Sequence, residues 1–285
     1  GDIINLIPPA WKPATLRFPE NSDPVAVLTA VQEAGLDFPL IAKPDLGERG
    51  LMVEKLSDAA ELEAYFSRET PAMLVQAYVD EPVEVGVLYY RMPGARQGEI
   101  TSLTLKRFLE VWGDGHSTVA ELMARDPRAA LQLPVLQRRD PALMARVPRA
   151  GERVELMPIG NHCRGTTFLD GRAEIDEALS RRFDAIADAL PGICFGRYDI
   201  RCRSLQALRE GHDFYILEIN GVKAEPTHIY QPGFSLVEAY RVLFRQWDTI
   251  YRIAQANRAA GVRVPAFGVV VRALCAQGAY RRRWG

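Results

Sequence analysis

The chain has 285 residues, of which 48% are hydrophobic and 25% are charged, and its net charge is −1. This composition is ordinary for a soluble globular protein and gives no general basic field for nucleic acid. We find no apolar run long enough to span a bilayer and no signal peptide, and no two of the four cysteines form a C-x-x-C pair, so we expect reduced thiols in the cytoplasm.

Residues 1–23 are rich in proline and lack periodicity, which predicts an extended arm. The chain begins with Gly1 instead of Met, so we expect a processed or truncated product. Asp23 and Pro24 then suit the N-cap and the first position of a helix. Apolar residues at helical spacing continue this helix to Gly35, which ends it.

A loop with two glycines, DLGERG (45–50), joins a predicted strand over 38–44 to another over 51–56. Gly47 and Gly50 would let backbone N–H groups approach phosphates, and Lys43 would add a positive charge beside them. The spacing is not that of the P-loop, and a plain hairpin is the competing interpretation.

The middle of the chain predicts alternating strands and helices. The strands are expected over 73–79, 83–91, 99–108 and 152–160, and the helices over 57–66, after Thr118, around 141–147 and over 176–190. Ser57 is the expected cap of the first helix, and Thr118 with Glu121 forms a capping box.

The stretch 196–220 predicts two strands joined by a polar loop. In the first strand Arg197, Asp199 and Arg201 share a face, and in the second Glu218 and Asn220 share a face. Pairing the strands can bring Asp199 beside Glu218 and Asn220.

Two carboxylates and an amide oxygen are hard donors that suit Mg²⁺. Leu217 and Ile219 would point to the opposite face. A sheet with a hydrated face and no metal is the competing interpretation.

After Asn220, a capping box at Ser235 and Glu238 opens a long helix. One apolar stripe of this helix, which we interpret as core packing, consists of Leu236, Tyr240, Leu243, Trp247, Ile250 and Ala254. Residues 261–285 predict a short helix and a solvated basic tail, for which we expect no membrane contact.

The order of these pieces resembles the ATP-grasp superfamily of ligases, over roughly residues 24–255. The matching pieces are Lys43 with its glycine loop, MLVQAYV with Glu84 downstream, KRFLEVWGDGHSTVAEL, GRYD and LEIN. The last two look most like the D-alanine–D-alanine ligase branch, and the long motif looks more like the cyanophycin synthetase and glutathione-synthesising branches. The family usually has an N-terminal domain of about a hundred residues, of which we expect only the proline-rich arm to remain in this sequence.

The resemblance implies an α+β, ATP-grasp fold in which a nucleotide is clamped between two α+β subdomains. It divides the chain into the arm 1–23, a small subdomain 24–98 with the glycine-rich loop, a large subdomain 99–260 with the metal and catalytic strands, and the C-terminal helix and tail 261–285.

The resemblance also implies a set of site residues. The ATP-binding residues would be Lys43, Gly47, Gly50, Gln76, Tyr78, Glu84 and Lys106, and the ligands of Mg²⁺, or alternatively Mn²⁺, would be Asp199, Glu218 and Asn220. Arg197 matches the arginine that faces the tetrahedral intermediate. Glu84 lies about one residue further along than in the usual motif, and Gln76 stands where a glutamate is common.

Three residues near the expected cleft, Arg164, Lys223 and His228, are candidates for binding substrate. The segment GVKAEPTHIYQPG, which follows Asn220, differs from the short Pro-Gly loop of the D-alanine ligases, so their amino-acid specificity does not carry over. His162 and Cys163 have no oriented partner in the sequence and are expected to be loop residues without a catalytic role.

The implied activity is that of an ATP-dependent ligase that joins a small-molecule carboxylate to an amine, or to a thiol, through an acyl phosphate. The alternatives are an ATP-grasp phosphotransferase acting on a hydroxyl and a non-catalytic nucleotide-binding module. We expect no nucleic-acid partner, and a homodimer is compatible with the sequence.

Overall fold

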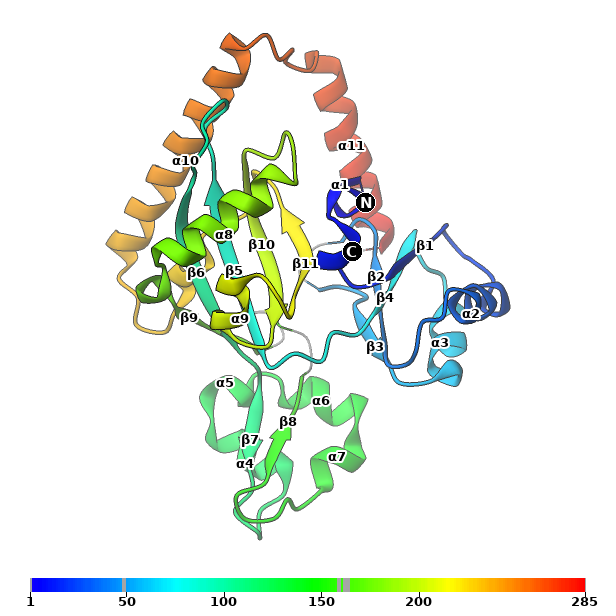
Figure 1. Ribbon diagram of the computed structural model, residues 1–285. Helices are drawn as coiled ribbons and strands as arrows, with labels where there is room; N and C mark the ends of the chain where they lie inside the picture. The colour runs from blue at the N-terminus through cyan, green and yellow to red at the C-terminus, as the bar shows by residue number, and fades with distance from the viewer. Residues whose placement is uncertain (1, 48–49, 158–159, 161–164, 285) are drawn as a thin grey trace.

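The computed structural model describes residues 2–47, 50–157, 160 and 165–284 (Figure 1). Within these ranges the strands form three sheets, and every strand pair in them is antiparallel. Helices pack beside the sheets and do not act as crossovers between parallel strands, so the α+β class predicted from the sequence is confirmed.

The small sheet has four strands in the order β1-β4-β2-β3. The elements of this lobe are β1 (Thr15–Phe18), α2 (Pro24–Glu33), β2 (Leu40–Pro44), β3 (Glu54–Leu56), α3 (Ala59–Phe66) and β4 (Met73–Ala77). Its core includes Val27 and Val31 of α2 and Leu62 of α3, together with Leu40 and Val75 of the sheet. This apolar layer holds the two helices on one side of the sheet (Figure 1).

Aspartate caps begin both helices of the small lobe. Asp23 accepts a hydrogen bond from the backbone N–H of Ala26 at 3.0 Å, as predicted. The cap of α3 is Asp58, which accepts from the N–H of Glu61 at 2.9 Å, so the prediction of Ser57 is wrong by one residue. Ser57 instead donates its backbone N–H to the Glu61 carboxylate at 2.7 Å.

The large sheet has five strands in the order β11-β10-β5-β6-β9. Its strands are β5 (Val83–Tyr90), β6 (Glu99–Arg107), β9 (Thr167–Asp170), β10 (Phe195–Cys202) and β11 (Phe214–Asn220), and the helices on it are α8 (Glu177–Asp188) and α9 (Leu205–Glu210). Helix α9 lies where the sequence predicts only a polar loop, because Ser204 caps it and Ala207 and Leu208 are buried.

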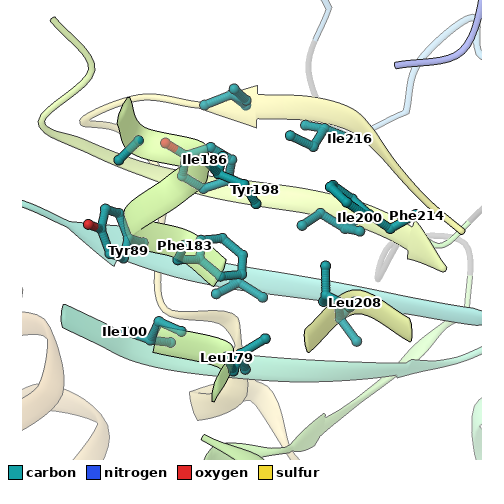
Figure 2. Packing of buried hydrophobic residues seen from close by; sticks show 14 of the residues in the cluster. Tyr89, Ile100, Leu179, Phe183, Ile186, Tyr198, Ile200, Leu208, Phe214 and Ile216 are labelled. Carbon is teal, nitrogen blue, oxygen red and sulfur yellow. The ribbon is translucent and has the colours of Figure 1, made fainter. Parts of the chain in front are cut away.

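Helices α8 and α9 cover one face of the large sheet, as Figure 2 shows. The Phe183 ring of α8 lies 5.8 Å from the ring of Tyr89 and 5.5 Å from that of Tyr198, measured between centroids. Leu179 and Ile186 of the same helix are fully buried in this core. Most apolar side chains of the sheet are used on this face. The opposite face holds the polar residues, together with Leu88 and Phe195, which share a buried cluster with Ile253.

The passage between the two sheets lies between β4 and β5. The predicted division at 98–99 would place β5 in the small lobe, whereas β5 pairs with both β6 and β10 in the large sheet. Each of these pairings satisfies backbone groups that would otherwise form an open edge.

A small third subdomain contains the two-stranded sheet β7-β8 and four short helices. Its elements are β7 (Glu110–Trp112), α4 (Val119–Arg125), α5 (Pro127–Ala130), α6 (Leu133–Arg139), α7 (Pro141–Ala145) and β8 (Arg153–Glu155). The sequence predicts only the first and last of these helices. Prolines at positions 127, 134 and 141 lie in the first turns of three of them, which divides the segment into short pieces.

The N-terminal residues do not form the extended arm that the sequence predicts. They form helix α1 (Asp2–Leu6), a 3-10 turn η1 (Pro9–Trp11) and strand β1. Ile7 is 1% exposed in the core of the large sheet, and the Trp11 ring lies 5.9 Å from the ring of Phe214. Burial of these apolar side chains accounts for the ordered path.

The 3-10 turn η3 (Arg172–Glu174) precedes α8. After β11 come the 3-10 turn η4 (Thr227–Tyr230) and two long helices, α10 (Leu236–Ala259) and α11 (Phe267–Trp284). The α10 stripe predicted as core is largely exposed: Leu236, Tyr240 and Trp247 are 71%, 56% and 61% exposed. The helix packs on the sheet through a different line, which includes the buried Gln246 and Ile253.

Helix α11 continues to Trp284, so the predicted solvated tail is helical. Its last turns contact both lobes: Arg283 pairs with Glu20 at 2.5 Å, and Gln277 accepts a hydrogen bond from the Lys223 ammonium at 3.1 Å. In the described part of the chain, no helix has the length and apolarity needed to cross a membrane.

Candidate functional site

A cleft of about 1040 Å³ lies between the small sheet and the polar face of the large sheet. Strand β10 supplies that face by simple alternation: Tyr198 and Ile200 enter the core, and Arg197, Asp199 and Arg201 line the cleft. Among the described residues, every site residue predicted from the sequence except His228 lines this cleft.

The pairing of β10 with β11 brings the predicted metal ligands together. Asp199 lies opposite Glu218, and Arg197 lies opposite Asn220. Residues directly opposite in an antiparallel pair project to the same face of a sheet. The structure therefore places these four side chains side by side at the floor of the cleft.

A β-bulge in β11 changes one detail of the predicted pattern. The register passes from Asp199 opposite Glu218 to Ile200 opposite Ile216, so Leu217 has no partner on β10. Leu217 and Ile219 both contribute to the lining of the cleft, and of the two Ile219 also belongs to the core of the large sheet. The Leu217 carbonyl accepts a hydrogen bond at 3.1 Å from the ammonium of Lys43.

Asp199 is surrounded by cations. Two nitrogens of the Arg197 guanidinium donate to its two carboxylate oxygens at 3.2 Å each, and the Lys106 ammonium lies 3.3 Å away. The amide of Asn220 donates to the same carboxylate at 3.1 Å. Burial alone would raise the pKa of Asp199, but Arg197 and Lys106 outweigh it and lower that pKa to about 2.

Glu218 lies next to Asp199 but differs from it in its hydrogen bonds and ion pairs. Within the described residues its carboxylate has no hydrogen bond or ion pair, and its side chain is open to the cleft. The enclosing walls of the cleft and the negative charge of Asp199 raise the pKa of Glu218, and the more distant Lys43 and Arg197 only partly oppose this shift.

Lys43 reaches across from the small lobe. Its ammonium donates to the side-chain oxygen of Gln76 at 3.0 Å and to Leu217 of the large sheet. Burial lowers the pKa of Lys43, and the charges of Glu218 and Asp199 partly restore it. Lys43 therefore contributes a positive charge at the junction of the lobes, where Glu218 and Asp199 influence its pKa without a direct ion pair.

At the other end of the cleft, Glu84 forms two buried ion pairs. One carboxylate oxygen lies 2.8 Å from Lys106, and the other lies 3.0 Å from Arg201. The three side chains are 5–6% exposed. The negative charges of Asp199 and Glu84 raise the pKa of Lys106 despite its burial. A Cβ on Gly160 would collide with the Glu84 carboxylate, so a glycine is needed to let the chain pass over it.

Arg201 is the residue of this cluster to which sequence reasoning assigns no role. It donates to the backbone carbonyl of Val79 at 2.6 Å and lies over the rings of Tyr78 and Phe108, 5.2 and 4.8 Å from their centroids. The available signal in the sequence was the spacing of two residues between Asp199 and Arg201, which places both on one face of the strand. It indicates the face of the sheet but cannot identify Glu84 as the partner.

The segment that joins the lobes is fixed by similar contacts. The Tyr78 backbone N–H donates to Pro39 at 3.2 Å, and the Lys55 ammonium lies 3.8 Å from the centre of the Tyr78 ring. Gly47 and Gly50 line the cleft from the small lobe, and the φ angle of Gly50 is +72°, which favours glycine. Residues 48–49 between them lie outside the described ranges.

No protein-family model and no curated protein sequence matches the chain. Solved structures that resemble it include a bifunctional glutathione synthetase of Pasteurella multocida, with 17% identity, a TM-score of 0.41, and coverage of 84% of this chain and 34% of that one. The VanG D-Ala:D-Ser ligase of Enterococcus faecalis has 12% identity, a TM-score of 0.45, and coverage of 83% and 57%. A D-alanine–D-alanine ligase of Bacillus anthracis has 13% identity, a TM-score of 0.45, and coverage of 88% and 64%.

One of these structures is a glutathione synthetase and two are ligases of D-alanine, the kinds of enzyme that the sequence resembles. The chain spans between about a third and two thirds of the length of these structures. Because the TM-scores are below 0.5, the likeness assigns no role to any residue, and the chemistry has to be argued from the side chains of the cleft.

The three substrate candidates have different positions. Lys223 lines the cleft, where it donates to Gln277 of α11. His228 does not line it: the ring is buried, Nδ1 lies 2.6 Å from the hydroxyl of Ser102, and burial lowers the pKa of His228 to about 4. Arg164 lies outside the described residues, as do His162 and Cys163.

Both ends of the chain contribute to the cleft, which the sequence does not predict. Ile3 and Ile4 of α1 and Arg281 of α11 are part of its lining. Periodicity within α11 predicts a helix, but it cannot show which other elements the helix reaches. Contacts between segments more than 250 residues apart have no local signal.

The donor set fits a hard divalent cation. Among the described residues no group of three or more His, Cys, Asp and Glu side chains could hold a metal ion, so a metal would depend on Asp199, Glu218 and the amide oxygen of Asn220. Glu218 is an acid without a hydrogen-bond partner in that part of the chain, and a cation would remove its repulsion from Asp199. Two carboxylates with an amide, completed by water and phosphate oxygens, are typical of Mg²⁺.

Proposed function

We propose that the chain is an ATP-dependent ligase that joins a small-molecule carboxylate to an amine, or less often to a thiol, with Mg²⁺ or Mn²⁺ as the metal. The observation that supports this most directly is the composition of one cleft floor. Lys43, Lys106 and Arg197 lie there beside Asp199 and Glu218, so cations for phosphate oxygens adjoin carboxylates for a metal. The cleft volume of about 1040 Å³ is at the upper limit of ordinary ligand pockets, as two substrates would require.

The charge of the lining is a reason to expect a metal with the nucleotide. The described residues of the lining include six basic and five acidic side chains, so their charges nearly cancel. A triphosphate brings several negative charges, and a lining that is almost neutral cannot balance them. Mg²⁺ held by Asp199, Glu218 and Asn220 would supply the missing positive charge beside the phosphates.

In the proposed reaction, a carboxylate oxygen of the substrate attacks the γ-phosphorus of ATP, and ADP leaves. The product is an acyl phosphate. The amine then attacks the acyl carbon, the C–O bond to phosphate breaks, inorganic phosphate leaves and the amine loses a proton. These steps need positioned charges more than covalent participation by the protein.

Each cation of the cleft has a proposed role in these steps. Lys43 and Lys106 hold phosphate oxygens, and the glycine loop with Gly47 and Gly50 closes over them. Arg197 stabilises the oxyanion that develops at the acyl carbon, for which its planar guanidinium offers several donors. We further propose that Gln76 and Tyr78 contact the base, that Lys223 contacts substrate, and that the protein acts in the cytoplasm.

The first test is binding of Mg-ATP. At a hundred times its dissociation constant the nucleotide should raise the free energy of unfolding by about 2.7 kcal/mol, and ATP without Mg²⁺ should give less. Glu218→Gln should remove the advantage of Mg²⁺, whereas Glu177→Gln, on the outer face of α8, should not. No stabilisation at millimolar Mg-ATP would contradict the proposal.

The second test is the reaction itself, in a screen of carboxylates with amines that measures ADP and inorganic phosphate. A ligase releases phosphate only when both a carboxylate and an amine are present. Formation of ADP with a hydroxyl compound alone, without release of phosphate, would mean that the protein is a phosphotransferase. Binding of Mg-ATP with no ADP under any combination would mean that it is a non-catalytic module.

A further inference from the structure

Helix α10 exposes a row of large apolar side chains that no other described element covers. The row consists of Leu236, Val237, Tyr240, Phe244, Trp247 and Tyr251, which are 56–72% exposed. Single exposed apolar residues are ordinary, but a contiguous patch of this kind marks an interaction site. We call these six residues the α10 seam.

The spacing of the seam is that of a helix that packs against another helix. From Val237 to Tyr251 the apolar positions advance by three, four, three and four residues, which is the heptad pattern of helix pairs. The seam is separate from the contact of α10 with its own sheet, because that contact uses the buried Gln246 and Ile253. The helix therefore has two packing faces, and only one of them has a partner within the chain.

The charged residues beside the seam favour a second copy of α10 as the partner, in the antiparallel orientation. Arg241 and Asp248 flank the seam, and both are exposed. In a parallel pair of α10 helices Arg241 and Asp248 would lie beside Leu236 and Leu243 of the second copy, so neither charge would meet an opposite one. In an antiparallel pair centred near Phe244, Arg241 faces Asp248 of the second copy, and Glu238 comes close to Arg252 of that copy. Arg245 lies near the axis on the outer flank, where its charge stays hydrated.

The area of the seam is also sufficient for such a pair. Aromatic side chains have roughly 150–250 Å² each, so the four exposed aromatic residues alone offer roughly 400–600 Å² per copy. Leu236 and Val237 add to this. A standard interface buries roughly 800 Å² per partner, which the seam and its flanking charged residues can reach.

We propose that the α10 seam is the interface of a homodimer, in which the α10 helices of two copies pack antiparallel about a two-fold axis. The arrangement is isologous, because the same patch serves both copies and the contact closes at two. Helix α10 packs on Leu88, Phe195 and Ala224 through Ile253, and none of the seam residues is part of the cleft lining, so pairing through the seam does not itself occupy the cleft. This inference does not depend on the proposed function.

The test is the molar mass of the 285-residue chain in sedimentation across the micromolar range. We expect a concentration-dependent species of twice the 31.8 kDa of one chain. Phe244→Glu and Trp247→Glu should each weaken the dimer tenfold or more, since buried central aromatics carry most of an interface's affinity. The matched control is Leu131→Glu, because Leu131 is 76% exposed at the end of α5, away from the seam.

A charge exchange tests the direction of the helices. Arg241→Asp alone and Asp248→Arg alone should each weaken the dimer, and the double variant should restore it, because every pair across an antiparallel interface is then opposite in sign again. In a parallel dimer the double variant would restore nothing. A monomer at all concentrations would overturn the proposal, as would binding of the chain to lipid vesicles through the seam or equal loss of dimer in the Leu131→Glu control.

Discussion

The Glu84 end and the Glu218 end of the cleft differ in how their charges are matched. Glu84 has a cation on each carboxylate oxygen, and the three residues of that cluster are 5–6% exposed. Glu218 lies open to the cleft and, among the described residues, has neither hydrogen bond nor ion pair. Both are glutamates on the polar face of one sheet, so residue type and strand alternation cannot distinguish them.

This difference separates a contribution to folding from a contribution to binding. The charges at the Glu84 end are satisfied by the protein itself, so removal of one partner should chiefly affect stability. The carboxylate at the Glu218 end repels Asp199 and has no close cation of its own, so a bound metal has most to add there. The role of Glu84 in nucleotide binding remains a prediction, and its ion pairs mean that a ribose would have to compete with Lys106 and Arg201.

The largest effect should come from breaking the Glu84 cluster. Arg201→Ala leaves Glu84 buried with one partner fewer, and loss of one partner from a buried pair typically costs about 3–5 kcal/mol. Urea unfolding would measure the change. The matched control is Arg181→Ala, which removes an exposed pair with Glu177 on α8 and should cost about 0.3–0.5 kcal/mol. Equal, small losses in both variants would mean that the Glu84 end has no special structural role.

How far the sequence predicts this molecule can be seen in β10 and β11. Strict alternation in β10 predicts correctly which side chains leave the core, because a strand buried on one face must keep period two. The bulge at Leu217 has no such signal, since it depends on how two strands register. The sequence accordingly brings Asp199 to Glu218 but does not predict the carbonyl that receives Lys43.

Helices illustrate the same limit. A helix cap such as Asp23 depends on residues adjacent in sequence, so it can be predicted from the sequence. Which face of a helix is buried depends on tertiary contacts, so it cannot. The α10 stripe has the spacing of a core face, yet Trp247 is 61% exposed. Likewise, nothing near Arg201 in sequence indicates Glu84, which is 117 residues away.

The second prediction concerns Arg197, which lies near the Glu218 end and pairs with Asp199. Arg197→Ala should slow single-turnover formation of product by a factor of about a hundred to a thousand, as loss of an oxyanion donor does. The free energy of unfolding should change less, because Lys106 and Asn220 still hold Asp199. Arg197→Lys keeps the charge but loses the planar fork, and it should recover little of the rate.

The opposite pair of results would assign Arg197 to stability. A variant with a lower melting temperature and near-normal turnover would make Arg197 a partner of Asp199 and not a catalytic residue.

The third prediction concerns the pH dependence of stability that comes from His228, a buried base outside the cleft. Burial lowers the pKa of His228 from about 6.5 to about 4, so the unfolded chain binds more protons than the folded one between these values. Stability should therefore rise with pH across this window, by about 3 kcal/mol in total for this residue. His228→Gln should flatten that rise in urea unfolding curves measured at several pH values. An unchanged slope would mean that His228 does not titrate as a buried base.

The fourth and smallest effect is the pH dependence of Glu218, which has the opposite sign. The pKa of Glu218 is raised in the folded protein, so above its ordinary value the folded chain binds more protons than the unfolded one. Stability should fall as the pH rises through that window. The slope should stay below the about 1.4 kcal/mol per pH unit of one full proton, because solvent in the open cleft screens the charge.

Mg²⁺ should cancel this fall, and that change is the sharpest distinction between the two ends of the cleft. A bound cation favours the ionised carboxylate and lowers the pKa of Glu218, so in saturating Mg²⁺ with ATP the fall above the ordinary carboxyl pKa should disappear, and stability should rise with pH only below that value. The comparison is best made in the His228→Gln background, which removes the opposing slope. Glu218→Gln in that background should show neither the fall nor its cancellation. If Mg²⁺ with ATP left the slope of the Glu218 protein unchanged, the metal would not be bound at this carboxylate.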